Sequence, residues 1–303
     1  MRIVSLIPSA TEIVCALGLR DQLVGVTHEC DFPPDVAEIP KVTHTLIPTD
    51  ASSAEIDSLV RGQLDNDCAL YRLNHDAIRT AQPDLIISQT LCDVCAVADR
   101  EVREVLETFT VSPRVIYLEP TVLNDVLESL RTVAAAANCP ERGEEAHAAL
   151  QKRIEAVRTR NATASRKKIV VLEWLDPLFS SGHWTPELVE IAGGIEPLAE
   201  AGARSREISI GELVESDPDM ILVACCGFSI ARTREDVRQF LAHPDITSLR
   251  CVRERQVFVV DGSAYFSRPG PRLVESLEIL AHWMNPTENP LRSREEAAIS
   301  AFV

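Results

Sequence analysis

The sequence lacks the short signatures that mark many common enzyme families. It contains no G-x-x-x-x-G-K-[ST] segment and no G-x-G-x-x-G segment, and only 12 of its 303 residues are glycine. The phosphate-binding loops typical of nucleotide enzymes are therefore excluded. The G-x-S-x-G elbow and the H-E-x-x-H helix are missing as well. These absences leave catalysis open but favour a protein that is not an enzyme.

Basic residues are scarce relative to acidic ones. The chain has 30 Lys and Arg against 46 Asp and Glu, which gives a formal net charge of −16. Binding to nucleic acid needs clustered Lys and Arg, so the composition argues against a nucleic-acid partner. The acidity is expected to serve solubility. No apolar run reaches the length of a membrane-spanning helix, so no membrane insertion is predicted.

The first residues offer no recognisable secretory signal. Met1-Arg2-Ile3-Val4-Ser5-Leu6 enters a predicted strand directly, without a basic region, a long apolar region or a small-residue cleavage site. The nine cysteines are odd in number and include the adjacent pair Cys225-Cys226, which is not typical of a disulfide framework. Cysteines that do not form a disulfide framework are typical of the reducing cytosol. Together with the missing secretory signal, they lead us to expect a cytoplasmic protein.

Apolar runs of strand length alternate with helical patterns along the chain. This alternation is typical of parallel sheets flanked by helices. The sequence therefore predicts an α/β protein with two Rossmann-like lobes, mainly parallel sheets and a ligand cleft between the lobes. The expected strands are residues 3–6, 24–26, 85–88, 115–118, 168–174, 220–224 and 257–260. The expected helices are residues 9–17, 73–81, 100–108, 186–192, 210–215 and 273–283, with a further amphipathic stretch at 53–64.

Local signals refine the boundaries of these elements. Ser9 with Glu12 three residues later predicts a capping box at the start of the first helix, and Gly18 is suited to its end. Residues 122–160 are rich in Ala and Glu, with breakers only at Asn138-Cys139-Pro140 and Gly143, and the part at 144–158 predicts a helix that joins the lobes rigidly. The expected domains are residues 1–121, a connecting segment 122–167, residues 168–285, and a C-terminal tail 286–303 with a short acidic helix.

Three cysteines follow two of the expected strands. Cys30 comes after the strand at 24–26, and Cys92 and Cys95 form a C-x-x-C pair after the strand at 85–88. The carboxyl ends of strands in an open α/β sheet are where ligands bind. Three thiols together would make a soft metal site, either for zinc with His28 or Glu29 as the fourth ligand or for an iron–sulfur cluster. Alternatively, each thiol is buried separately as an inert packing residue.

Five sequence segments taken together are typical of one protein family. The segments are Arg2-Ile3-Val4-Ser5-Leu6-Ile7-Pro8-Ser9-Ala10-Thr11-Glu12 followed by Leu17-Gly18 and Val24-Gly25-Val26, Cys30-Asp31-Phe32-Pro33, Pro83-Asp84-Leu85-Ile86, Glu190-Ile191-Ala192-Gly193-Gly194 and Pro269-Gly270-Pro271-Arg272. Over about residues 1–285 the chain resembles the cobalamin- and siderophore-binding proteins of ABC importers (class III substrate-binding proteins). It is most similar to their cobalamin-binding branch.

This resemblance implies a binding function without catalysis. It implies two lobes joined by one long helix, with a corrinoid or a similar metal-bearing ligand in the cleft. Members of the family also present one surface glutamate per lobe to the importer, and Glu55 and Glu212 are the counterparts by position. The alternative for both is that they are ordinary solvated carboxylates on helices. The identity of any protein partner stays open.

The resemblance also implies a set of ligand contacts. The loop at 179–184 and the segment 261–268 line the pocket in that family, so Trp184, Tyr265 and Phe266 are expected to cover a flat macrocycle. Glu173 and Trp174, which follow the strand at 168–172, are further candidates. The alternative for the aromatic residues is packing between domains.

Three features depart from the family pattern. They are the cysteine triad, the insertion at residues 47–72 and the missing signal sequence, and they indicate a cytoplasmic, cysteine-containing offshoot. His28 or a thiolate could serve as an axial ligand to corrinoid cobalt. A second hypothesis is a metalloprotein with an iron–sulfur cluster or zinc on Cys30, Cys92 and Cys95 and a redox or enzymatic role. A third is a sensor or adaptor for another protein.

Overall fold

The chain folds into two compact units. A computed structural model describes residues 1–48, 51–64, 71–89, 99–287 and 298–302. Unit 1 comprises Met1–Pro120 and Asn124–Ala149, and unit 2 comprises Thr121–Leu123 and Leu150–Val303. Each unit contains a mainly parallel sheet with helices packed around it, so the predicted α/β class is confirmed.

Unit 1 is built on a four-stranded parallel sheet. Its strands are β1 (Ile3–Ser5), β2 (Leu23–Gly25), β5 (Leu85–Ser88) and β6 (Arg114–Tyr117), in the order β2-β1-β5-β6. The strands β1 and β5 are buried along their full length, which explains their unbroken apolar sequences. A separate antiparallel pair consists of β3 (Thr43–Thr45) and β4 (Tyr71–Leu73).

The helices of unit 1 largely follow the predicted pattern. They are α1 (Pro8–Ala16), α2 (Ser53–Leu64), α3 (His75–Ala81), α4 (Asp99–Leu106) and α5 (Leu123–Ala136), with 3₁₀ turns at Arg20–Gln22 and Pro34–Glu38. The predicted N-cap at Ser9 is wrong. Pro8 already occupies the first helical turn, Ile7 is the N-cap, and Ser9 is buried. Gly18 follows the helix with φ +68°, as expected for a helix-ending glycine.

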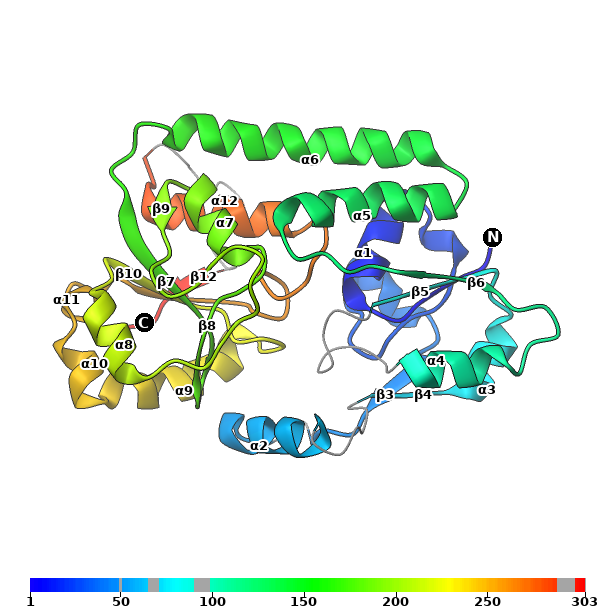
Figure 1. Ribbon diagram of the computed structural model, residues 1–303, viewed down its shortest axis with the longest axis horizontal. Coiled ribbons are helices and arrows are strands. Elements are labelled where there is room, and N and C mark those ends of the chain that lie inside the picture. The colour runs from blue at the N-terminus through cyan, green and yellow to red at the C-terminus, as the bar shows by residue number, and fades with distance from the viewer. Residues whose placement is uncertain (49–50, 65–70, 90–98, 288–297, 303) are drawn as a thin grey trace. The chain divides into compact units, whose positions relative to one another are not determined.

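The connecting segment consists of two helices, which are separated at the predicted breakers around Asn138. Asn138 adopts a left-handed conformation (φ 58°) between α5 and α6 (Pro140–Asn161). The two helices lie side by side (Figure 1), and a Cβ on Gly143 would approach the Ala134 Cβ to 2.6 Å. Glycine at this position therefore allows the two helices to approach closely. The helix α6 begins in unit 1 and ends in unit 2.

Unit 2 has a larger, mixed sheet. Its strands are β7 (Lys167–Leu175), β8 (Leu178–Ser180), β9 (Gly194–Ile195), β10 (Met220–Val223), β11 (Val257–Val260) and β12 (Ala298–Ser300). The order is β12-β11-β10-β7-β8, and β9 pairs with β7. The central strands β7, β10 and β11 are parallel, whereas β8 and β12 are antiparallel edge strands.

The helices of unit 2 surround this sheet (Figure 1). They are α7 (Thr185–Ile191), α8 (Ile210–Ser216), α9 (Ile230–Ala242), α10 (Pro244–Ser248), α11 (Arg250–Arg253) and α12 (Leu273–Met284). Val170, Leu172, Ile221, Val223 and Val257 belong to one core cluster that packs against residues from α8 to α11. The burial of these strand residues positions the loops at the carboxyl ends of β7, β10 and β11.

The C-terminal residues contribute to unit 2. The sequence predicted an appended tail with a short acidic helix, but β12 pairs with β11 in antiparallel register, with Ile299 opposite Val259. Residues 288–297 lie outside the described part of the chain. In the described residues, no helix has the length and apolar character needed to cross a membrane.

Candidate functional site

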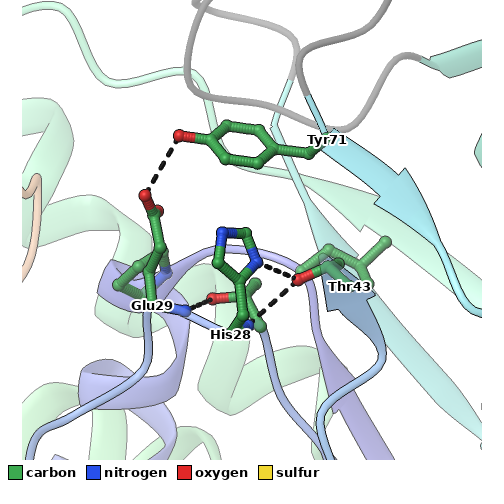
Figure 2. Close-up of a pocket in the computed structure, with 7 residues that line it drawn as sticks. His28, Glu29, Thr43 and Tyr71 are labelled. Carbon is green, nitrogen blue, oxygen red and sulfur yellow. Dashed lines mark hydrogen bonds between the residues drawn. The ribbon is translucent and has the colours of Figure 1, made fainter. Parts of the chain in front are cut away.

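A small pocket in unit 1 lies at the carboxyl ends of β1 and β2. Figure 2 shows four of its residues, His28 and Glu29 from the loop after β2, Thr43 from β3, and Tyr71 from β4. The full lining is Leu6, Pro8, Thr27, His28, Glu29, Thr43 and Tyr71. The pocket therefore occupies the edge at which α/β sheets bind ligands.

The backbone explains why distant residues meet here. Val26 pairs with Lys41, and the Val42 N–H donates to the Val26 carbonyl at 2.9 Å. This extension of β2 brings β3, and with it Thr43, alongside the loop that carries His28. The strand β4 then pairs with β3 and places Tyr71 opposite Thr45.

Thr43 fixes the imidazole ring of His28. The Thr43 Oγ1 accepts the His28 backbone N–H at 3.0 Å and lies 2.7 Å from His28 Nδ1. In Figure 2 the other ring nitrogen lies on the side of the ring away from Thr43. Among the described residues, Nε2 has no hydrogen-bond partner. One nitrogen therefore orients the ring, and the other is left for a ligand.

The pKa of His28 lies below its ordinary value. Burial is the main cause, the charges of His44 and Lys41 lower it further, and Glu29 opposes the shift. The imidazole is therefore neutral near pH 7, and a neutral imidazole nitrogen is a common metal ligand.

Tyr71 closes the pocket on a second side. Its hydroxyl donates to Glu29 Oε1 at 3.0 Å, and its ring centroid lies 5.1 Å from that of His28. The strand that carries Tyr71 is itself anchored, because Glu101 Oε2 accepts the Leu73 N–H at 2.8 Å and Oε1 accepts from Arg72 at 2.9 Å. The hairpin therefore holds the phenol in place.

The pocket is small. The space that its residues enclose is about 10 Å³, which is room for about one water-sized group. Pockets that bury a whole drug-sized ligand occupy roughly 300–1,000 Å³. The pocket in unit 1 therefore does not enclose a large ligand.

Cys30 lies behind this pocket as a buried thiol. The Sγ of Cys30 is 3.2 Å from Thr27 Oγ1 and 3.1 Å from Thr11 Oγ1. The Thr11 hydroxyl in turn donates to Ser5 Oγ at 2.9 Å, and the Ser5 hydroxyl donates to the Ile7 carbonyl at 2.9 Å. The thiol proton therefore has a place in a continuous chain of donors. Burial raises the pKa of Cys30, although the threonine hydrogen bonds oppose the shift.

These observations do not support the predicted metal site. The contacts of Cys30 with Thr11 and Thr27 fit the alternative that this thiol is a buried packing residue. Cys92 and Cys95 lie outside the described residues. In the part of the chain that the structure describes, no group of three or more His, Cys, Asp or Glu side chains could hold a metal ion.

The predicted ligand contacts of unit 2 divide into two groups. Trp184 and Phe266 are only 6% and 1% exposed, and Trp184 Nε1 donates to the Phe266 carbonyl at 2.7 Å. Both side chains therefore pack inside unit 2 rather than forming an open surface. Trp174 and Tyr265 are partly exposed. Glu173 Oε1 accepts the Gly182 N–H at 3.2 Å, which ties the loop after β8 to β7.

The predicted partner-docking glutamates both serve as helix caps. Glu55 accepts from the Ser52 N–H and hydroxyl at 2.8 and 2.7 Å, and Glu212 accepts from the corresponding groups of Ser209 at 2.8 and 3.0 Å. These hydrogen bonds hold the pKa of each carboxyl below its ordinary value. Helix capping explains their geometry, and partner docking stays a prediction for both.

Sequence reasoning missed Thr43 and Tyr71. Thr43 lies on a three-residue strand before the insertion and Tyr71 on one that overlaps its end, and short polar strands carry little periodicity. Val42 before Thr43 and the pair Tyr71 and Leu73 were the available signals, because alternating β-branched and aromatic residues are typical of strands.

Comparison with known proteins places the chain in a family. A sequence model described as periplasmic binding protein matches residues 3–264. The chain belongs to the periplasmic binding protein family. The family resemblance inferred from the sequence is thus confirmed, and the cytoplasmic location stays a prediction.

Curated relatives match almost the whole chain. A vitamin B12-binding protein of Vibrio cholerae is 23% identical over 286 residues, covering 91% of this chain and 86% of the relative. A vitamin B12-binding protein of Pectobacterium carotovorum is 24% identical over 277 residues, covering 90% and 84%.

Solved structures share the fold. The periplasmic heme-binding protein RhuT from Roseiflexus sp. RS-1 aligns with a TM-score of 0.71 at 22% identity, covering 95% of this chain and 99% of that protein. The periplasmic vitamin B12-binding protein BtuF of Vibrio cholerae aligns with a TM-score of 0.67 at 22% identity, covering 94% and 96%. The periplasmic heme-binding protein HutB of Vibrio cholerae aligns with a TM-score of 0.72 at 17% identity, covering 94% and 99%.

Proposed function

We propose that the chain binds a corrinoid, a cobalamin-like tetrapyrrole, without changing it chemically. The periplasmic binding protein model matches residues 3–264 of the chain, and the curated relatives described above are vitamin B12-binding proteins. The observation that carries the proposal is the geometry of His28. Its Nδ1 lies 2.7 Å from Thr43 Oγ1, and its Nε2 is on the other side of a neutral, half-buried ring.

The His28–Thr43 contact is suited to metal binding. When Nδ1 carries the proton and donates it to Thr43 Oγ1, Nε2 presents its lone pair to the ligand. Histidines that bind metals usually donate their second ring N–H to an oxygen in this way, which fixes the tautomer and the ring orientation. His28 would bind the corrinoid metal, and Thr43 would hold the ring.

The size of the pocket defines what it can bind. The enclosed space of about 10 Å³ is too small for a macrocycle, so a tetrapyrrole would contact the pocket at its mouth through His28 Nε2. The edges of Leu6, Pro8 and Tyr71 would contact the macrocycle at this point. Glu173, Trp174 and Tyr265 remain the proposed contacts from unit 2.

Titration with aquocobalamin tests the proposal directly. Replacement of the metal-bound water by an imidazole shifts the visible spectrum, so we expect a saturable shift with the wild-type chain. His28→Ala should abolish the shift and weaken binding at least tenfold. Thr43→Val should weaken binding by about tenfold, in line with typical effects of the hydrogen-bond partners of metal ligands. His44→Ala, an exposed histidine beside Thr43 on β3, is the matched control and should bind normally.

A parallel titration with hemin separates the two tetrapyrrole classes. Binding of hemin without binding of aquocobalamin would contradict the corrinoid assignment, and RhuT and HutB would then be the better functional guides. If neither compound gives a spectral shift or a heat of binding, the proposal is overturned. Normal binding by His28→Ala would show that the metal is held elsewhere.

A further inference from the structure

Both faces of the strand β11 are buried within unit 2. Val257 and Val259 belong to the core cluster, and the Phe258 ring centroid lies 4.1 Å from that of Trp283 on α12. On one side, β11 forms a parallel pair with β10. The edge on its other side therefore still needs a partner for its backbone N–H and C=O groups.

Residues near the C-terminus supply that partner. The strand β12 pairs with β11 in antiparallel register, with Ala298 opposite Val260. One residue beyond β12, the Ala301 N–H donates to the Val257 carbonyl at 2.9 Å. Residues 298–301 therefore follow the full length of β11.

Side chains of the same segment pack against the core. Ile299, Ala301 and Phe302 contact the core cluster of unit 2. The guanidinium carbon of Arg255 lies 5.8 Å from the Phe302 ring centroid, within the range of a cation–π contact. The segment is thus held as extended peptides are held by strand addition, with backbone hydrogen bonds along an edge and side chains in apolar contacts.

The edge strand β8 of the same sheet is covered as well. The Ser180 N–H donates to the Arg206 carbonyl at 2.9 Å, and the Ile208 N–H donates to the Leu178 carbonyl at 2.9 Å. An uncovered apolar edge is a template for pairing with another chain, and proteins block such edges with short strands or with loops. The strand β12 has three residues and is followed by a turn, so it adds little edge of its own.

We propose that the β11 edge is a pairing surface for a second copy of this chain, and that β12 blocks it. The register of β12 demonstrates that an antiparallel strand fits this edge. The sequence of β11 is Val-Phe-Val-Val, and β-branched and aromatic residues are typical of strands. Two β11 edges paired antiparallel would be related by a two-fold axis, with Val257 of one copy opposite Val260 of the other. Two-fold symmetry is the commonest symmetry of soluble oligomers.

Detachment of β12 in the full chain tests the proposal. The double variant Ile299→Asp with Phe302→Asp should release the segment, because a carboxylate packed against an apolar core without a partner is unfavourable. We expect the double variant to form a dimer of about twice the mass of the wild type. The dimer fraction should rise with protein concentration in sedimentation equilibrium.

Hydrogen–deuterium exchange identifies the surface that is used. The amides of β11 that face β12 should be protected in the wild type. In the double variant they should exchange rapidly at low protein concentration, where the chain is monomeric, and become protected again as the dimer forms.

A peptide supplied separately should replace the missing strand. A synthetic peptide of residues 298–303, added in excess, should occupy the edge and return the double variant to the wild-type mass. The same peptide carrying Ile299→Asp and Phe302→Asp should leave the dimer intact, since it lacks the apolar contacts.

Ile195→Asp is the matched control. Ile195 is 42% exposed on the short strand β9 of the same unit, so this variant adds a charge in place of an apolar residue without detaching β12. It should keep the wild-type mass. Thermal melts would verify the folding of each variant. If the double variant does not fold, Phe302→Ser alone should loosen the segment and give a smaller dimer fraction.

The proposal has clear contrary outcomes. A folded double variant that keeps the wild-type mass at every concentration would overturn it. Association without protection of β11, or a dimer that the peptide does not dissociate, would assign the contact to another surface. Equal protection of β11 in the wild type and the monomeric double variant would show that β12 does not cover this edge. Aggregates without a defined mass would contradict pairing about a two-fold axis.

Discussion

Asp84 and Arg2 are joined by two hydrogen bonds to the Arg2 backbone at the start of β1. The Asp84 Oδ2 accepts the Arg2 N–H at 2.7 Å, and the Asp84 N–H donates to the Arg2 carbonyl at 2.8 Å. Asp219 and Lys168 repeat this pair at the start of β7, with both distances at 2.8 Å. The same pair of hydrogen bonds therefore joins two neighbouring strands in each unit.

Loss of either aspartate should destabilise the strand pair that it joins. Asp84→Ala and Asp219→Ala remove a charged acceptor from a backbone N–H, which typically costs about 1.5–3 kcal/mol. Because Asp84 is exposed and Asp219 is partly exposed, we expect about 1 kcal/mol or less in urea unfolding. Asp76→Ala, an exposed carboxylate on α3, is the control and should change stability by less than about 0.5 kcal/mol. Equal stability of Asp84→Ala and the wild type would contradict the expectation.

The repeated Pro-Asp segments made much of the fold predictable. Residues 81–87 and 216–222 share a helix end, a Pro-Asp pair and an apolar strand. Gln82 and Asp217 both adopt left-handed conformations, with φ 43° and 41°. The strands β5 and β10 are buried along their full length, and burial on both faces of a strand leaves a run of apolar residues in the sequence.

The errors have specific physical causes. Within the described part of the chain, the pattern Ser-x-x-Glu occurs at Ser9, Ser52 and Ser209, and a capping hydrogen bond forms at Ser52 and Ser209 but not at Ser9. At Ser9, the preceding Pro8 already starts the helix. The short strands β3, β4 and β12 were missed because they contain polar residues and lack the apolar runs that marked β1 and β2, and their pairing is decided by tertiary contacts.

The site was partly predictable. The segment with His28 and Cys30 was recognised from its position after a strand. The burial of Cys30 and its contacts with Thr11 and Thr27 could not be predicted, because they depend on how separate segments pack. Tyr71 could not be placed because its neighbours in space lie far away in the sequence.

The thiols should differ sharply in reactivity. Cys226 is exposed, whereas Cys30, Cys225 and Cys251 are buried. Burial raises the pKa of Cys225 to about 12 and that of Cys251 to about 11. At pH 8 we expect iodoacetamide to label Cys226 rapidly and these three only after unfolding, since the thiolate is the reactive form.

Peptide mapping by mass spectrometry would measure this difference. Labelling in urea provides the control, because all sites should then react. Rapid native labelling of Cys30 would contradict its place in the buried hydrogen-bond chain. It would also revive the hypothesis of a thiolate metal site.

Glu101 should be important for the hairpin that carries Tyr71. Its carboxylate accepts from the Leu73 N–H at 2.8 Å and from Arg72 at 2.9 Å, and its side chain is 9% exposed. Glu101→Ala would leave a buried N–H unpaired, so we expect a loss of about 2 kcal/mol in unfolding free energy. Glu104→Ala, on the exposed side of α4, is the control and should cost less than about 0.5 kcal/mol. Chemical denaturation would measure both, and a wild-type midpoint for Glu101→Ala would contradict the anchoring role.

Glu196 should give unit 2 a pH-dependent stability. Its carboxylate accepts from the Val171 N–H at 2.9 Å, the Leu198 N–H at 3.1 Å and the Ser181 hydroxyl at 3.2 Å. Burial nevertheless raises its pKa to about 7, because desolvation outweighs these hydrogen bonds. The folded chain therefore holds a proton that the unfolded chain releases near pH 4.5.

The sign of the effect follows from this raised pKa. The contribution of Glu196 to stability is fully present below about pH 4.5 and is lost as the pH rises through about 7. The full shift corresponds to about 3 kcal/mol, and because Glu196 keeps some exposed area we expect about 2 kcal/mol.

The free energy of unfolding of the wild type should thus fall relative to Glu196→Gln between pH 5 and pH 8, as measured by urea denaturation at each pH. Glu200→Gln, an exposed neighbour, should follow the wild type. A constant difference between wild type and Glu196→Gln would show that the carboxyl is already ionised at pH 5, and that its three hydrogen bonds outweigh its burial.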